Sequence, residues 1–189
     1  MRSEFEVWHA LLRGKGLSVT DLAARLGVTR QHAHRLLTGR RPAESQREEL
    51  EQALALGRPT TGSPLFAIGE LDDNGELDLV PAGDAQPLFA DRELATDVAR
   101  ALEAASLQVC VVPVWPEYAW RNLVSFHAAW GAQPEPRKLF VVDNGMDDLP
   151  LDALVNEIRA GLDATLRSRA QAHDPVYLSE VESHLQRLN

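Results

Sequence analysis

The chain has 189 residues, of which 44% are hydrophobic and 25% are charged, and a globular protein of this composition is large enough to bury a core without disulfides or a structural metal. Its single cysteine, Cys110, excludes an internal disulfide, and no apolar stretch approaches the roughly 20 residues that a membrane span requires. The net charge of −9 argues against a nucleic-acid partner for the chain as a whole. The first 30 residues lack the order of a signal peptide, so we expect a cytoplasmic protein without membrane contact.

Charge is distributed unevenly along the chain. Residues 1–58 carry 10 basic and 7 acidic side chains, a net charge of +3, whereas residues 59–189 carry 9 basic and 21 acidic side chains, a net charge of −12. Within the first part, residues 13–41 contain seven Arg and Lys side chains against the single acid Asp21. A basic window of this kind is typical of a surface that binds a polyanion.

The first 57 residues are expected to be entirely helical. An apolar pattern at helical spacing runs over residues 5–12 and ends at Gly14. A second pattern runs over residues 50–56 and ends at Gly57. No strand signal interrupts them.

Between these patterns, two short helices joined by a tight turn are predicted. Ser18 with Asp21 three residues later approximates a capping box, so a helix should begin directly after Ser18 and end at Gly27. Thr29 is suited to cap a second helix, which should end at Gly39. Two short helices with a glycine in the turn between them form a helix-turn-helix. The predicted inward-facing residues are Leu22, Ala23, Leu26, Ala33, Leu36 and Leu37.

The second helix of this pair has a basic, hydrogen-bonding face once its inward residues are assigned. Arg can bind guanine through two hydrogen bonds, and Gln can bind adenine in the same way. Side chains at the N-terminal end of such a helix are the ones that reach base edges in the major groove. We therefore expect base contacts from Arg30, Gln31, His32 and Arg35, and phosphate contacts from Arg13, Lys15, Thr29, Arg40 and Arg41.

The run from Leu17 to Gly39, followed by two arginines and Pro42, resembles the helix-turn-helix of the lambda-repressor-like Cro/XRE family. The resemblance covers about residues 4–56. It implies an all-helical DNA-binding domain of four or five helices. In that family, the positions that commonly touch bases correspond here to Arg30, Gln31 and Arg35.

The composition changes at residues 57–64, which include two prolines, two glycines and three hydroxyl side chains. Such a segment breaks helices and strands. We therefore expect an all-α helix-turn-helix domain at residues 1–57, a linker at 58–64, and an acidic α/β or α+β regulatory or oligomerisation domain at 65–189.

The second domain is expected to begin with a hairpin. Its strands are predicted at residues 65–71 and 76–80, with Leu71 opposite Leu77 and with Gly75 in the left-handed conformation. The acidic side chains of this hairpin would repel phosphates, so we do not expect it to contact DNA. The elements predicted after it are a helix at 91–105, a strand at 107–114, a helix at 117–130, a strand at 138–143, and helices at about 151–172 and 177–188.

One aromatic cluster is open to several interpretations. Five of the 11 aromatic side chains fall within residues 115–130, on a predicted helix that is apolar around much of its circumference. Such a helix is either deeply buried or covered by something outside the chain. Core packing, a subunit interface and a small-ligand pocket therefore remain open for Trp115, Tyr118, Trp120, Phe126, His127 and Trp130.

The sequence lacks a phosphate-binding glycine loop, a Gly-x-Ser-x-Gly turn, paired cysteines and a His-Glu-x-x-His pattern, so we expect no enzyme activity, catalytic residue, metal or cofactor. It predicts a dimeric transcriptional repressor that binds a palindromic site in double-stranded DNA through residues 29–38. The C-terminal domain would join the two chains, and any small-molecule or protein effector is unidentified. Two alternatives stay open: a DNA-targeting module for an enzymatic or partner-binding domain, and an antitoxin-like interaction protein.

Overall fold

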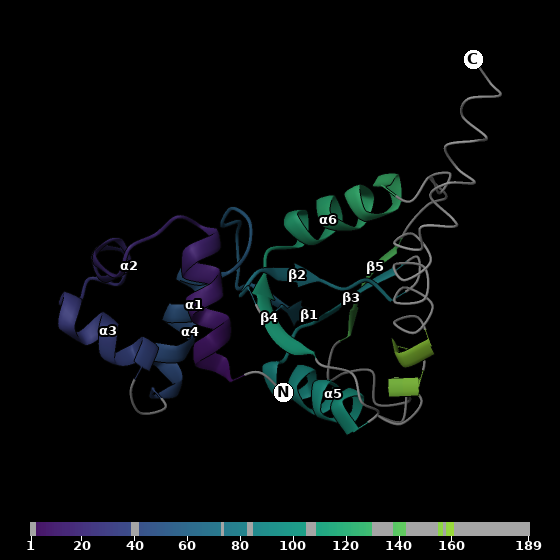
Figure 1. The fold of residues 1–189 in the computed structure, drawn as a ribbon, viewed down its shortest axis with the longest axis horizontal. Coiled ribbons are helices and arrows are strands. Elements are labelled where there is room, and N and C mark those ends of the chain that lie inside the picture. The colour runs from purple at the N-terminus through teal and green to yellow at the C-terminus, as the bar shows by residue number, and fades with distance from the viewer. Residues whose placement is uncertain are drawn as a thin grey trace, which may run out of the picture.

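The structure is a computed structural model, and it describes residues 3–38, 42–72, 74–82, 85–104, 109–129, 138–142, 155–156 and 158–160, without the side chains of residues 104, 124–129 and 138–142. In this part of the chain, four helices come first and a five-stranded sheet with two further helices follows (Figure 1). The fold is therefore mixed α+β, with its first helices set apart from the sheet in sequence.

The two short helices predicted between Ser18 and Gly39 are observed with their predicted N-terminal caps. The Ser18 hydroxyl accepts from the Asp21 N–H at 3.2 Å while the Asp21 carboxylate accepts from the Ser18 N–H at 2.8 Å, which confirms the predicted capping box. Gly27 ends that helix in the left-handed conformation, with φ 63°. The Thr29 hydroxyl accepts from the His32 N–H at 3.2 Å and so caps the next helix. The four helices are α1 (Glu4–Gly14), α2 (Val19–Leu26), α3 (Arg30–Thr38) and α4 (Glu44–Leu54).

The sheet is organised around one central strand. It consists of β1 (Leu65–Leu71), β2 (Leu77–Leu79), β3 (Ala85–Phe89), β4 (Cys110–Val114) and β5 (Lys138–Val142). One edge of β1 pairs antiparallel with β4, and the other edge pairs antiparallel with β2 and, further along, with β3. The last strand, β5, lies parallel to β3. Among these five strands, each pairing is therefore antiparallel except that of β3 with β5.

The predicted hairpin is confirmed in both register and turn. Leu71 lies opposite Leu77, and Gly75 has φ 76°. The N–H of Asp72 donates to the carbonyl of Glu76 at 3.0 Å, which closes the turn.

Strand β3 is absent from the sequence prediction. Its sequence, with Gln86 and Pro87 at its centre, has neither β-branched residues nor an alternating pattern. The strand is defined by pairing with distant segments, because Phe89 lies opposite Phe66 in β1 and Val142 in β5. These partners lie 23 and 53 residues away in the chain and leave no local signal.

Two helices cover the faces of the sheet, α5 (Arg92–Ala104) on one side and α6 (Pro116–Ala129) on the other (Figure 1). The predicted helices at 91–105 and 117–130 are confirmed to within about one residue over the described range, and the strand predicted at 138–143 is observed as β5. Of the helix predicted at 151–172, only residues 155–156 and 158–160 are described, and they are helical. The helix predicted at 177–188 lies outside the described residues.

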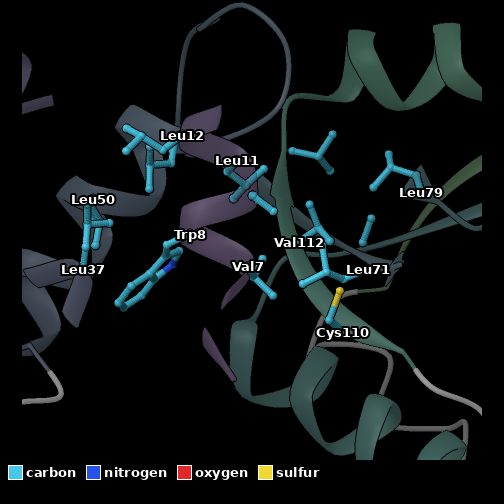
Figure 2. Packing of buried hydrophobic residues seen from close by; sticks show 14 of the residues in the cluster. Val7, Trp8, Leu11, Leu12, Leu37, Leu50, Leu71, Leu79, Cys110 and Val112 are labelled. Atoms are coloured by element: carbon cyan, nitrogen blue, oxygen red, sulfur yellow. The ribbon is translucent and has the colours of Figure 1, made fainter. Parts of the chain in front are cut away.

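Helix α1 is buried on two sides. Figure 2 shows Trp8 on the side of α1 that faces Leu37 and Leu50, and Val7 and Leu11 on the side that faces strand β4. These residues belong to one buried cluster that extends into the sheet, where it includes Cys110 and Val112. The four helices and the sheet therefore share a hydrophobic core.

The segment after α4 also joins the sheet, which corrects the prediction of helix up to Gly57: α4 ends at Leu54, and Leu56 forms a parallel bridge with Val114. The Leu56 N–H donates to the Pro113 carbonyl at 3.0 Å, and the Leu56 carbonyl accepts from the Trp115 N–H at 2.9 Å. The domain boundary at residues 58–64 stays a prediction. Just before this segment, Leu56 connects the helical part directly to strand β4.

Candidate nucleic-acid interface

Helix α3 has a buried face and an exposed basic face. Ala33, Leu36 and Leu37 are buried, at 0%, 7% and 0% exposure, as the sequence predicts. Among the described helices, α3 lies at the far end of the molecule from the sheet (Figure 1). None of its nine residues is acidic. The exposed side chains on its outer face include Arg30, Gln31, His34 and Arg35.

The exposed face of α3 is fixed in place by its packing against α2. Ala23 and Ala33 are both buried, at 4% and 0% exposure, and their small side chains let the two helices approach closely. Leu22, at 0% exposure, lies in the same core cluster as Leu37. The side chains on the outer face are thus carried by a helix whose orientation is set by tight packing.

Two of the predicted DNA contacts also make contacts within the helical part. The Thr29 hydroxyl accepts from the His32 N–H, and its own O–H proton is still available to donate to a phosphate. His32 is half-buried, and its Nε2 lies 3.5 Å from Nε2 of Gln46 in α4. Contacts of Thr29 and His32 with DNA stay predictions. Arg40 and Arg41 lie outside the described residues.

The other two predicted phosphate contacts, Arg13 and Lys15, lie beside the hairpin turn. The Nη2 group of Arg13 donates to the Gly75 carbonyl at 2.6 Å. Lys15 is half-buried, and burial together with the nearby Arg25 lowers the pKa of its ammonium group. Both side chains line a cleft of about 750 Å³ to which α3 contributes no residue. Their contact with DNA stays a prediction, but their surroundings differ from those of the α3 arginines.

The predicted aromatic cluster is divided among several environments. Trp115 is fully buried at 0% exposure, whereas Trp120 is 40% exposed. Tyr118 is half-buried and lines the cleft, where burial and the nearby Asp78 carboxylate raise its pKa. Phe126 and His127 lie on α6, but their side chains are not among those described. Trp130 lies outside the described residues.

A buried ionic network joins the helical part to the sheet, and sequence analysis missed it. Arg92, at the start of α5, donates from Nη1 to Glu4 at 3.0 Å and from Nε to Glu51 at 2.5 Å. Arg47 is 4% exposed and lies 3.4 Å from Glu4. Burial raises the pKa of Glu51, and the guanidinium groups of Arg92 and Arg47 limit the rise.

A signal for this network is present in the sequence of α4. Its buried positions are Arg47, Leu50, Glu51 and Leu54, which are spaced as one helix face. Two of these four are charged, and charged residues at core positions require partners. Glu44 on α4 also lies 3.5 Å from Arg47, but Glu4 and Arg92 lie on other helices, so spacing along α4 gives no information about them.

No protein-family model matches the chain, and comparisons with curated proteins and with solved structures find no match. Among the described residues, no helix is both long and apolar enough to cross a membrane. The same part of the chain has no group of three or more His, Cys, Asp or Glu side chains placed to bind a metal ion.

Proposed function

We propose that the chain binds double-stranded DNA through α3 and acts as a dimeric transcriptional repressor. The observation that carries the proposal is the exposed, acid-free face of α3, where Arg30, Gln31 and Arg35 project from a helix packed firmly on its other side. These side chains have the donors and acceptors that distinguish base pairs in the major groove. The resemblance of residues 4–56 to the Cro/XRE family favours the same assignment.

In this proposal the residues of the helix pair divide into two roles. Arg30, Gln31 and Arg35 contact bases and determine the sequence preference. The Thr29 hydroxyl and the arginines at positions 40 and 41 contact phosphates and set the orientation of α3. Phosphate contacts dominate affinity at low salt, so the basic residues of 13–41 can bind DNA even though the chain as a whole is acidic.

One α3 reaches one half-site, so a palindromic operator requires two chains. The two copies of α3 would lie about 34 Å apart, one helical turn of DNA. We assign dimerisation to residues 65–189, because the exposed face of α3 must remain free for DNA. Occupancy of a promoter by such a dimer would exclude polymerase, which accounts for repression.

The test is selection of genomic fragments by the purified full-length chain at near-physiological salt, followed by sequencing of the bound fragments. An enriched motif with two inverted half-sites supports the proposal. Bound fragments without a common motif would refute sequence-specific binding.

A pair of variants then tests the role of α3. Arg35→Ala should weaken binding to the selected motif by about ten-fold or more and relax the preference at one base position, since a bidentate contact contributes about 1–3 kcal/mol. The matched control is Arg100→Ala, which removes the same charge from an exposed position on α5, where the side chain is 65% exposed. Equal losses from both variants, measured by fluorescence anisotropy, would contradict the assignment of base contacts to α3.

A further inference from the structure

A cleft of about 750 Å³ lies where the helical part meets the sheet. Its walls come from the end of α1, from α2, from the segment after α4, from the hairpin turn and from α6. The Arg13 guanidinium crosses from α1 to the turn, where it donates to the Gly75 carbonyl. The volume falls in the range of sites for small molecules up to the size of a nucleotide.

The cleft is basic, although the chain is acidic. Four cationic side chains line it, against the two carboxylates of Glu76 and Asp78. Within the described part of the chain, none of the four cations lies within 4.0 Å of a carboxylate. The four come from three separate segments: Arg13, Lys15, Arg25 and Arg58.

We propose that this cleft binds a small anionic molecule that carries at least two negative charges. Three of its four cations are arginines, whose planar guanidinium groups bind phosphate or carboxylate oxygens through paired hydrogen bonds. Tyr118 and Asn74 also line the cleft and offer hydroxyl and amide groups to the remainder of such a molecule.

The state of Lys15 supports an anionic occupant. Its side chain is half-buried, and both burial and the neighbouring Arg25 lower the pKa of the ammonium group. The Arg25 guanidinium acts on Lys15 as a like charge, and like charges disfavour each other. An anion between Lys15 and Arg25 would remove this repulsion, which favours binding at this wall of the cleft.

The position of the cleft suggests what its occupant regulates. Arg25 is in the last turn of α2, the helix against which α3 packs, whereas Gly75 and Asn74 belong to the hairpin of the sheet. An anion that bridges these walls would change the position of α2 and, through it, the orientation of α3. This regulatory role rests on the proposed DNA binding, whereas anion binding itself does not.

The site is tested by isothermal titration calorimetry of the full-length chain with pyrophosphate, citrate and ADP as separate probes. We expect one molecule per chain for at least one probe. The cleft variant is Lys15→Met with Arg58→Ala, and the matched control is Arg100→Ala with Arg159→Ala, which removes two positive charges from exposed positions away from the cleft. The cleft variant should bind about ten-fold more weakly or worse, and the control should bind as the native chain does.

Folding of each variant is checked by circular dichroism, and Arg58→Ala alone provides a milder change because Arg58 is exposed. This single variant should weaken binding about three-fold or more. Tighter binding of pyrophosphate or ADP than of citrate would identify a phosphate ligand, and the reverse order a polycarboxylate. No binding of any probe at about 10 mM, or equal weakening in the cleft and control variants, would overturn the site.

The regulatory role has a separate readout. The probe that binds should change the affinity of the chain for its selected DNA motif by about five-fold or more. Arg58→Ala, which changes a cleft residue outside the predicted DNA contacts, should need about three-fold more probe for the same response while still binding DNA. An anion that binds without altering DNA affinity would overturn the regulatory role and leave the binding site standing. Failure of DNA selection itself would refute the proposed function, without bearing on the calorimetry.

Discussion

Replacement of Arg92 by methionine tests whether the buried ionic network holds the helices against the sheet. The Arg92 side chain is 14% exposed and lies 2.5 Å from Glu51, whose side chain is 4% exposed. It also contacts Glu4 at 3.0 Å and lies over the Phe66 ring at 5.7 Å from the ring centre. Methionine keeps an unbranched apolar side chain at this position and removes the guanidinium group from Glu4, Glu51 and the Phe66 ring.

We expect this change to lower the free energy of unfolding by about 3 kcal/mol. Removal of one partner from a buried ion pair costs about 3–5 kcal/mol, because the remaining charge stays buried and has lost its partner. The expected loss for Arg92→Met lies at the lower end of this range, because Glu4 is 30% exposed and Arg47 still acts on Glu51. The matched control is Arg100→Met on the same helix, which breaks an exposed pair with 65% and 52% exposed side chains and should cost no more than about 0.5 kcal/mol.

The loss should also depend on pH. Burial places the pKa of Glu51 above its ordinary value of 4.5, and Arg92 limits that rise, so the pKa rises further in the variant. A carboxyl group with a raised pKa binds its proton more tightly in the folded chain than in the unfolded one. Its contribution to stability is full below the unfolded pKa and is lost as pH rises through the folded pKa. The deficit of Arg92→Met should therefore be smaller at pH 5 than at pH 7.5.

Urea unfolding followed by tryptophan fluorescence measures both effects, because Trp8 and Trp115 are fully buried. Similar losses from Arg92→Met and Arg100→Met would refute the view that the network stabilises the junction. A deficit that grows as pH falls would refute the assignment of the residual buried charge to Glu51.

Two further changes test the local geometry. Gly57 has φ 93°, and a Cβ added there would lie 2.7 Å from the Tyr118 Cβ. Gly57→Ala should therefore destabilise the fold by about 2 kcal/mol. The control, Gly14→Ala, adds a Cβ with nothing within 4 Å and should be neutral or stabilising by up to about 1 kcal/mol. Thermal unfolding compares the two, and an unchanged melting temperature for Gly57→Ala would contradict the close approach of α6. Ser18→Ala removes the hydroxyl cap of α2 and should cost about 1 kcal/mol in urea unfolding, so a loss near zero would show that the cap contributes nothing.

The parts of the fold that sequence analysis predicts are those with local causes. Ser18 and Asp21 form their capping box three residues apart, and the register of Leu71 against Leu77 follows from the three-residue loop that ends at Gly75. The buried and exposed faces of α3 likewise follow from spacing within nine residues. Each of these features depends on neighbours in the chain, so the pattern contains the necessary information.

The features that were not predicted depend on contacts between distant segments. Val7 and Trp8 are adjacent and both buried, and only the fold shows that one faces the sheet and the other faces α3 and α4. The contact of Arg13 with Gly75 joins residues 62 positions apart, and that of Arg92 with Glu4 joins residues 88 positions apart. For this reason the basic window of residues 13–41 gave no sign that Arg13 and Lys15 belong to a cleft and lie apart from the α3 surface.

The burial of α1 on two sides limits the operator spacing that the proposed DNA-binding dimer would accept. Because one helix belongs both to the packing around α3 and to the packing on the sheet, α3 does not swing on a tether. In a symmetric pair joined through the sheet domain, the separation and relative rotation of the two α3 helices would be fixed for a given state of the cleft between α2 and the hairpin. One extra base pair between half-sites shifts them by about 3.4 Å and turns them by about 34°. A rigid pair cannot follow that change, so such a regulator would tolerate only one operator spacing.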